Sequence, residues 1–292
     1  MRLFKYLHPD RTDVLRDGTI RFSPPTALND PFELKPHFSA FMRQEKIPLE
    51  IARLMPTVVA EDHAKLAPEI QALIPLDLLQ AMMTACIPQL TTLAGTGFEM
   101  FLEKIPDLFS QKFAELIGIL CLTESPTNLL MWAHYADAHQ GFVVEFDPES
   151  RFFNQRVGPD DDFRHLRRVV YQDERPSIIL TEMEDFSPFL TKGRDWSYET
   201  EWRMMMPLAA ASRIVGQPPA AVHLFEFPKS MVRSVICGCR MTDSKKAEIL
   251  DILQRTQEYA HVTSLAAQVD ESQYRVNVTE GFRSNRAYQK PA

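Results

Sequence analysis

The sequence predicts an α+β protein with a mixed, largely antiparallel sheet and an all-helical insertion. Strand-like segments occupy both ends of the chain, but they do not alternate with helices in the regular order of a parallel sheet. Between them, residues 40–117 are rich in Leu, Ala and Met and are broken by repeated prolines, as expected for several short helices. We therefore expect a single α+β domain over residues 1–285, with the helical insertion at 40–117 inside it.

The composition is that of an ordinary globular protein. The chain has 292 residues, of which 45% are hydrophobic and 24% are charged, so it can bury a sizeable core. Its net charge of −7 provides no overall positive field to attract nucleic acid. A basic cluster at residues 164–168 is interpreted as a solvated strand edge rather than as a phosphate site.

The sequence lacks the usual features of secreted and membrane proteins. The chain turns polar after seven residues and has no apolar run of the kind found in a signal peptide. The longest apolar stretches, such as residues 116–122, are far shorter than the roughly 20 residues that a membrane span requires. Four cysteines do not make a disulfide framework in a chain of this length. We therefore expect a cytoplasmic protein without membrane contact, in an undetermined oligomeric state.

The first 35 residues predict a strand, a short helix, a second strand and a turn. Residues 2–7 are aromatic and strand-like, and residues 11–18 form one or two helical turns that Gly18 closes. In residues 19–23, apolar and polar side chains alternate as they do in a half-buried strand. Residues 24–33 are dense in Pro, Asn and Asp, which predicts a fixed turn.

After residue 117 the sequence predicts mainly strands. Residues 118–125 are typical of a buried strand, and a helix then begins with Ser125 as its cap and Pro126 at its first position. Gly141 ends this helical segment. Further strands are expected at residues 142–146, 166–172, 201–207, 222–227, 232–238 and 274–280, with a helix at residues 242–260 before the last of them.

Residues 128–146 contain the first candidate site. Trp132, His134 and Tyr135 lie within two helical turns there, so one helix face can be core and the other a cleft wall. Taken alone, the residues favour the structural interpretation, in which the aromatic rings are core residues and His134 is a satisfied interior histidine. His134 and His139 are five residues apart rather than the four that put two ligands on one helix face, so no metal site is expected.

Glu199 and Glu201 form the second candidate site, just before an apolar strand. Because they are two residues apart, both can project to the same side. A carboxylate pair in that position suits the stabilisation of a developing cation or the polarisation of a hydroxyl. The alternative is an edge strand that uses Glu for solubility and Arg203 as an ion partner. The residues alone leave both interpretations open.

The turn at residues 24–33 is the third candidate. Asn29 and Asp30 precede Pro31 in an Asx-type turn, which is a sufficient structural explanation. The same turn can also hold Ser23 and Asn29 beside a ligand. The sequence contains no Gly-rich phosphate loop, nucleophile elbow or H-E-x-x-H motif.

Five sequence blocks occur in an order that matches a known family. They are the aromatic-Lys-Tyr start at residues 4–6, NDPFE at 29–33, MWAHYADAHQGF at 131–142, KGRDWSYETEWR at 192–203 and VICG at 235–238. Together they resemble the bacterial and phage family catalogued as domain of unknown function twenty-nine seventy-one, from Leu3 to about Gln254. The resemblance implies an intracellular bacterial or phage-linked protein, often of the phage-defence or toxin kind.

The block order is also similar to that of ADP-ribosyltransferases. In that superfamily a basic or His residue on the first strand grips NAD, a Ser or Tyr supports the nicotinamide ribose, and a late Glu holds the ribose 2′-hydroxyl while the glycosidic bond breaks. The resemblance assigns the first role to Lys5 or Tyr6, the second to Ser23 and the third to Glu201, with Glu199 orienting the acceptor. Lys5 stands where the superfamily usually has Arg or His, and Ser23 is not part of a clear S-T-S motif.

The resemblance and the candidate sites together predict an NAD-dependent ADP-ribosyltransferase-like enzyme with NAD as its substrate and a protein or nucleic acid as its acceptor. The expected catalytic residues are Glu201, Glu199 and His134, and the expected NAD contacts are Lys5, Tyr6, Ser23, Asn29, Trp132 and Tyr135, with Trp132 or Tyr135 as the stacking surface. These residues must then line one pocket, because polar groups are costly to bury without partners.

Two other functions remain open. The first is a non-catalytic module that senses a nucleotide or a phage protein in the same cleft, an interpretation that the Met-rich insertion favours because Met surfaces adapt to partners. The second is a metal-dependent nuclease that uses His134, Glu199 and Glu201, although their spacing matches no known ligand pattern.

Overall fold

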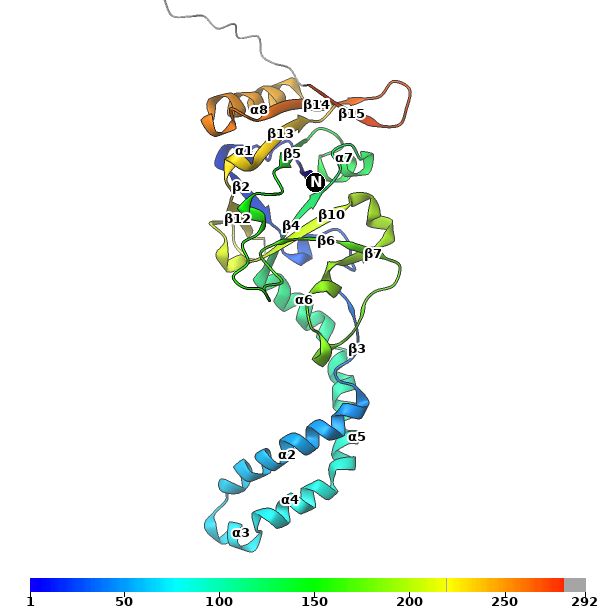
Figure 1. The fold of residues 1–292 in the computed structure, drawn as a ribbon, viewed down its shortest axis with the longest axis vertical. Helices are drawn as coiled ribbons and strands as arrows, with labels where there is room; N and C mark the ends of the chain where they lie inside the picture. The colour runs from blue at the N-terminus through cyan, green and yellow to red at the C-terminus, as the bar shows by residue number, and fades with distance from the viewer. Residues whose placement is uncertain (219, 281–292) are drawn as a thin grey trace, which may run out of the picture. The chain divides into compact units, whose positions relative to one another are not determined.

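The computed structural model describes residues 1–218 and 220–280 and divides the chain into two compact units (Figure 1). The first unit consists of Met1–Leu34, Lys112–Glu174 and the described part of Leu190–Ala292. The second unit consists of Lys35–Gln111 and Arg175–Phe189. The second unit thus contains most of the predicted insertion, together with a short segment from much later in the chain that the sequence did not indicate.

An eight-stranded sheet forms the centre of the described part of the first unit, in the order β15-β14-β13-β5-β1-β4-β10-β6. Its strands in chain order are β1 (Leu3–Leu7), β4 (Ile117–Thr123), β5 (Phe142–Phe146), β6 (Leu166–Arg168), β10 (Glu201–Pro207), β13 (Val232–Cys237), β14 (Thr263–Val269) and β15 (Val276–Glu280). Neighbouring strands are antiparallel except β13 and β14, which are parallel. The predicted α+β class with a mixed, largely antiparallel sheet is confirmed.

Two smaller sheets also lie in the described part of the first unit. One has the order β11-β12-β2, and the other pairs β7 with β9 in parallel. Their bounds are β2 (Thr19–Phe22), β11 (Arg213–Val215), β12 (Val222–Glu226), β7 (Val170–Gln172) and β9 (Thr191–Gly193). The single strand predicted at 166–172 is therefore two short strands, β6 and β7, which belong to different sheets.

Apolar cores cover both faces of the central sheet. On β5, Phe142 and Phe146 belong to one core and Val143 to the other, so every residue of this strand is buried. Helix α1 (Asp13–Asp17) and helix α8 (Asp243–Arg255) contribute to the first core, and α7 (Leu129–Tyr135) contributes to the second. The side chains of the predicted strand 142–146 therefore alternate between two cores, not between a core and solvent.

Helix α7 begins later than the sequence predicted. Its N-cap is Asn128, whose Oδ1 accepts hydrogen bonds from the backbone N–H groups of Leu130 (2.9 Å) and Met131 (3.1 Å). The expectation that Ser125 caps this helix is wrong, because an amide oxygen placed one residue before the first turn satisfies two of its free donors. The helix also ends at Tyr135, several residues before Gly141, which the sequence predicted as the end of the helical segment.

Strands β1 and β4 are adjacent in the central sheet but separate after a single register pair. The pair is Phe4 with Thr123, whereas β1 and β5 share five register pairs along their whole length. Further along β4, Ile119 pairs instead with Ser23, which follows β2. The backbone of β4 at Cys121 therefore lies between two different partners, and the sheet opens there.

The second unit is built mainly from helices. They are α2 (Ile47–Ala64), α3 (Pro68–Leu73), α4 (Leu76–Ala85) and α5 (Ile87–Leu102), with the strands β3 (His37–Ala40) and β8 (Ser177–Ile179) paired in parallel. Helix α6 (Ile105–Leu116) runs from this unit into the first. Neither α4 nor α5 has a buried residue, and a groove of about 610 Å³ between α2, α4 and α5 is apolar except for Glu50. Among the described residues, no helix has both the length and the apolar character to cross a membrane.

Candidate functional site

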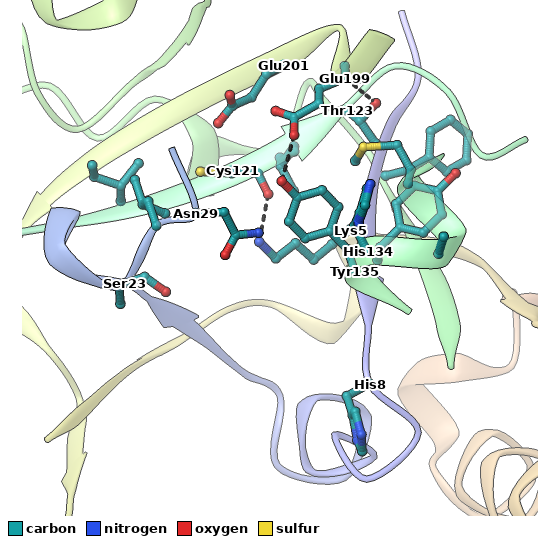
Figure 2. Close-up of a pocket in the computed structure, with 18 of the residues that line it drawn as sticks. Lys5, His8, Ser23, Asn29, Cys121, Thr123, His134, Tyr135, Glu199 and Glu201 are labelled. Carbon is teal, nitrogen blue, oxygen red and sulfur yellow. Dashed lines mark hydrogen bonds between the residues drawn. The ribbon is translucent and has the colours of Figure 1, made fainter. Parts of the chain in front are cut away.

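A pocket of about 580 Å³ occupies the opening between β1 and β4, entirely within the first unit. Cavities of this size are typical of small-molecule and cofactor sites. Its wall consists of β1, the end of β2 and the turn after it, β4, α7 and the segment from Lys192 to Glu201 (Figure 2). The residues that line it are Phe4, Lys5, Tyr6, His8, Ser23, Ala27, Leu28, Asn29, Glu33, Ile119, Cys121, Leu122, Thr123, Met131, Ala133, His134, Tyr135, Asp137, Ala138, Lys192, Glu199 and Glu201.

The structure brings together eight of the nine candidate residues named from the sequence. Those that line this pocket are Lys5, Tyr6, Ser23, Asn29, His134, Tyr135, Glu199 and Glu201. They come from four segments that are far apart in the chain, so their convergence is a property of the fold and not of any local motif. Their catalytic and binding roles stay predictions.

Trp132 does not line the pocket, and its expected role as a stacking surface is wrong. Its side chain is fully buried, its indole Nε1 donates to the Pro126 carbonyl (2.9 Å), and its ring packs edge-on against Tyr6. Trp132 thus belongs to the core, whereas Tyr135 of the same helix lines the cavity. The hydroxyl of Tyr6 is also occupied, because it donates to the Ser125 carbonyl (2.9 Å).

Lys5 spans the opening between the two strands. Its Nζ donates to the Cys121 carbonyl (2.8 Å), at the position where β4 lies between its two strand partners (Figure 2). An ammonium group thus satisfies an acceptor that a neighbouring strand would otherwise occupy. Burial lowers the pKa of Lys5, and the nearby Glu201 carboxylate partly opposes this effect.

Five charged residues meet at one end of the pocket, and we call them the charged cluster: Glu33, Lys192, Glu199, Glu201 and Arg203. All five are buried. Lys192 Nζ lies 2.6 Å from Glu199 Oε2, 3.4 Å from Glu201 Oε2 and 3.7 Å from Glu33 Oε2. Three carboxylates against two cations leave the cluster with a formal charge of −1. Such an excess inside a protein is costly unless a cationic or hydrogen-bonding ligand can approach it.

Glu201 forms a bidentate ion pair with Arg203. Its two carboxylate oxygens accept from Arg203 Nε (2.8 Å) and Nη2 (2.9 Å), and Arg203 Nη1 forms an ion pair with Glu33 Oε1 at 2.5 Å. Burial raises the pKa of Glu201, but the Arg203 guanidinium outweighs it and holds the pKa at about 2. The predicted Arg203 partnership is therefore present, although β10 is not an edge strand, because β4 and β6 flank it.

Glu199 has a different environment. Its Oε1 accepts from the Tyr135 hydroxyl (2.6 Å) and its Oε2 from Lys192, so one side faces α7 and the other faces the charged cluster. Burial raises the pKa of Glu199; Lys192 opposes this shift and the neighbouring Glu201 adds to it. Glu199 is therefore the carboxylate of the pair that takes up a proton more readily than Glu201.

A local backbone twist presents both carboxylates to the pocket. Thr200 adopts the left-handed conformation (φ 42°) between the 3₁₀ helix that ends at Glu199 and the strand that begins at Glu201. Thr123 Oγ1 donates to the Glu199 carbonyl (2.5 Å) and fixes this turn (Figure 2). The sequence predicted that the two Glu side chains share one side of a strand, whereas Glu199 in fact precedes the strand.

The rim of the pocket next to α7 has a strained backbone. Asp137, Ala138 and His139 are consecutive non-glycine residues with positive φ values of 46°, 49° and 71°. Residues other than glycine rarely adopt positive φ values, and those that do are mostly single residues rather than neighbours in the chain. After these residues the backbone passes close to β1 at Gly141. Only glycine fits there, because a Cβ would lie 2.0 Å from the Leu7 carbonyl oxygen. Strain of this kind concentrates at functional sites, and Asp137 and Ala138 both line the pocket.

Several lining residues were not among the sequence candidates. Lys192 and Glu33 belong to blocks that the sequence analysis quoted, so their position in a shared motif was a usable signal. His8 and Cys121 had no such signal: His8 follows β1 directly, and Cys121 lies on β4 where the sheet opens. His8 Nε2 lies 3.6 Å from Asp137 Oδ2 at the rim.

One segment of the chain that contributes to the pocket matches a known protein family. Residues 131–204 match the family model described as Protein of unknown function (DUF2971). The match supports the predicted family over this segment, which runs from α7 through Lys192 and both Glu residues to β10. No curated protein and no solved structure matches the chain.

Removing the cation at the centre of the charged cluster should destabilise the first unit. We predict that Lys192→Met costs about 3–5 kcal/mol in free energy of unfolding, because three carboxylates then face Arg203 alone. The deficit should shrink as pH falls through the carboxylate range, since protonation removes the charge that Lys192 balances. Denaturant unfolding followed by tryptophan fluorescence measures this, because all three Trp residues belong to the first unit.

Arg194→Met is the matched control. Arg194 pairs with Asp173 at the surface, where both side chains are mostly exposed, so its loss should cost less than about 1 kcal/mol. A Lys192→Met deficit no larger than that of the control, or one that does not vary with pH, would contradict the role given to Lys192.

Proposed function

We propose that this pocket binds NAD and transfers its ADP-ribosyl group to an acceptor, as an ADP-ribosyltransferase-like enzyme. The observation that carries the proposal is the position of Glu199, a buried carboxylate with a raised pKa between the Tyr135 hydroxyl and the Lys192 ammonium, at the wall of a cavity of about 580 Å³. The order strand, short helix, strand at the start of the chain and the E-x-E before β10 also support it.

The residues present fit such a substrate. The excess negative charge of the charged cluster suits the positive charge that develops on a ribose when its bond to nicotinamide weakens. Lys5 and Ser23 lie on the other walls of the cavity, where they can bind the remaining polar groups of a dinucleotide. Tyr135 presents its ring and hydroxyl beside Glu199 and can orient the ribose.

In the proposed reaction the bond between ribose C1′ and the nicotinamide nitrogen breaks, and its electron pair leaves with neutral nicotinamide. The acceptor atom forms a bond to C1′, and its proton passes to Glu199. Glu201 holds Lys192 and Arg203 in place and adds fixed negative charge. The sequence-based prediction gave the direct role to Glu201. We give it to Glu199 instead, because Arg203 holds the pKa of Glu201 at about 2 and makes it a poor proton acceptor, whereas burial raises the pKa of Glu199. His134 lies exposed at the cavity beside Tyr135, where it can contact the acceptor.

A second candidate is a binding module that recognises a nucleotide without turning it over. The observation that favours it is the helical part of the second unit, where α4 and α5 expose apolar side chains such as Leu78, Met82 and Leu93. Neighbouring apolar side chains that are exposed in this way are typical of surfaces that bind a partner. The metal-dependent nuclease is not carried further, because no group of three His, Cys, Asp or Glu side chains in residues 1–218 and 220–280 is placed to hold a metal ion.

Substitution of the two carboxylates should separate their roles. We expect Glu199→Gln to lower the rate of nicotinamide release from NAD by about 10²–10³-fold with the fold intact, because one preorganised group of the reacting site is lost. Glu201→Gln should lower the free energy of unfolding and reduce the rate of the folded protein less. Nicotinamide release, measured by chromatography with candidate acceptors or water, provides the readout.

A Glu199→Gln variant as active as the wild type would contradict the proposal. If Glu201→Gln alone abolished the release, the roles given to the two residues would be reversed. If NAD raised the melting temperature in a Glu199-dependent way but released no nicotinamide, the binding module would be the correct function.

The pH dependence should report the hydrogen bond between Tyr135 and Glu199. The rate should rise with pH as Glu199 loses its proton, since the carboxylate form accepts the proton of the acceptor. Tyr135→Phe removes a donor that stabilises this carboxylate, so the pKa of Glu199 increases further and the acid limb moves to higher pH by about one unit. The measurement is kcat/KM against pH. Tyr198→Phe, a neighbouring substitution without a hydrogen bond to Glu199, should leave the limb in place, and an equal shift in both variants would contradict the assignment.

A further inference from the structure

We propose that the apolar groove between α2, α4 and α5 binds a basic amphipathic helix of a partner protein. The groove has a volume of about 610 Å³ and lies entirely within the second unit, whereas the residues that line the pocket all belong to the first. The inference therefore goes beyond the function proposed for the pocket and does not rest on it.

The groove has a buried floor and exposed borders. Ile47, Met55 and Val59 of α2 line it and are buried. Leu54 of α2 and Leu93 of α5 also line it but are 49% and 70% exposed. Figure 1 shows α2 on one side and α4 and α5 on the other. A small apolar ligand would stay largely in contact with water here, because small-molecule sites enclose most of their ligand.

The length of the groove suits a helix. The lining residues of α2 extend from Ile47 to Val59, which corresponds to about 18 Å along the helix axis, or about three turns. They recur every three or four positions, at 47, 50, 51, 54, 55, 58 and 59, and those of α5 do so at 90, 93, 94 and 98. Each set therefore lies on one face of its helix.

The walls of the groove offer side chains rather than backbone groups. The backbone N–H and C=O groups of a helix bond to one another, so an extended peptide, which binds by adding to a free sheet edge, gains no hydrogen bonds here. An amphipathic helix bonds its own backbone internally and buries its apolar face against the apolar side chains of such a groove. We therefore infer that the occupant is helical.

The charge of the surrounding helices favours a basic partner. Residues 66–103, which include α3, α4 and α5, contain four acidic residues and no Lys, Arg or His. The groove is lined by one charged residue, Glu50 of α2, which pairs with Arg53 at the surface (2.6 Å). A second copy of this chain would bring two such acidic surfaces together at a cost in repulsion. Lys and Arg on the polar face of a partner helix would be attracted instead.

Helices α4 and α5 lack the packing that normally stabilises short helices. Within residues 76–85 and 87–102 no side chain is buried, and α5 contains two interior glycines, Gly95 and Gly97, which lower its helix propensity. A partner helix in the groove would cover the inner faces of α4 and α5. Met42, Met55 and Met83 line the groove, and their flexible side chains adapt readily to the surface of a partner.

Synthetic peptides of leucine and lysine test the groove with the full chain. The probe is a labelled peptide of about 18 residues, long enough to form a helix, with all its Leu on one helix face. It should bind saturably in fluorescence anisotropy, gain helix content in circular dichroism, and slow amide hydrogen exchange in residues 76–102. A Leu/Glu peptide of the same pattern and a shuffled Leu/Lys peptide without an apolar face should bind at least roughly tenfold more weakly.

Substitutions at the exposed borders of the groove locate the peptide. Leu93→Gln on α5 and Leu54→Gln on α2 should each weaken binding about tenfold, because each removes an apolar contact with the peptide. Both side chains are exposed in the free chain, so the fold should be preserved, and if one variant does not fold the other provides the test. Leu78→Gln is the matched control, since Leu78 is 51% exposed on α4 but is not among the lining residues.

Binding that is weakened by Leu54→Gln and Leu93→Gln, but not by Leu78→Gln, supports the proposal. Groove variants that bind the probe as tightly as the control overturn it, and so does equal binding of the Leu/Glu or the shuffled peptide. A wild-type dimer in sedimentation that Leu93→Gln converts to monomers also overturns it, because a second copy then occupies the groove. None of these measurements depends on NAD or on the release of nicotinamide.

Discussion

The early separation of β1 from β4 is the constraint on which the site depends. Two adjacent strands of a sheet normally satisfy each other's backbone groups along their length. Here a single register pair, Phe4 with Thr123, is followed by an opening, and the acceptor left at Cys121 is bound by the Lys5 ammonium. A gap of this kind inside a large sheet is stable only when polar side chains replace the missing ladder. The pocket is the consequence, and residues from β1, β4, α7 and the start of β10 face it because they border the gap.

Electrostatics then determines what the pocket can hold. The charged cluster keeps an excess carboxylate near Glu199, whereas Lys5 spans the opening between β1 and β4. The excess negative charge lowers the stability of the isolated chain, and a ligand of matching charge that binds there would restore it. The strained backbone at residues 137–139 adds to this cost. Several residues that border one cavity thus lower the stability of the isolated chain, which is typical of a binding or catalytic site.

Sequence reasoning was most successful where spacing or motif order carries the information. It predicted β1, α1, β2, β5, β10 and the α+β class, because alternation and capping residues are local signals. It also predicted that Tyr135 and Glu199 belong to one site, because their motifs occur together in a family that the chain resembles. What it missed depends on contacts across the fold. Trp132 belongs to the core whereas Tyr135 lines the pocket, and Cys121 reaches the pocket only because β1 and β4 separate in the folded sheet.

The central claim is that the opening beside β4 holds a nucleotide in one orientation. A crystal structure of the protein with ADP-ribose tests it most directly, because this product analogue carries the diphosphate and both riboses without the reactive bond. The account predicts that a hydroxyl of the terminal ribose lies within hydrogen-bonding distance of Glu199 and that the diphosphate lies on the side of the pocket that Lys5 lines. Ordered ADP-ribose outside this pocket, or bound inside it with the diphosphate at the charged cluster, would contradict the account.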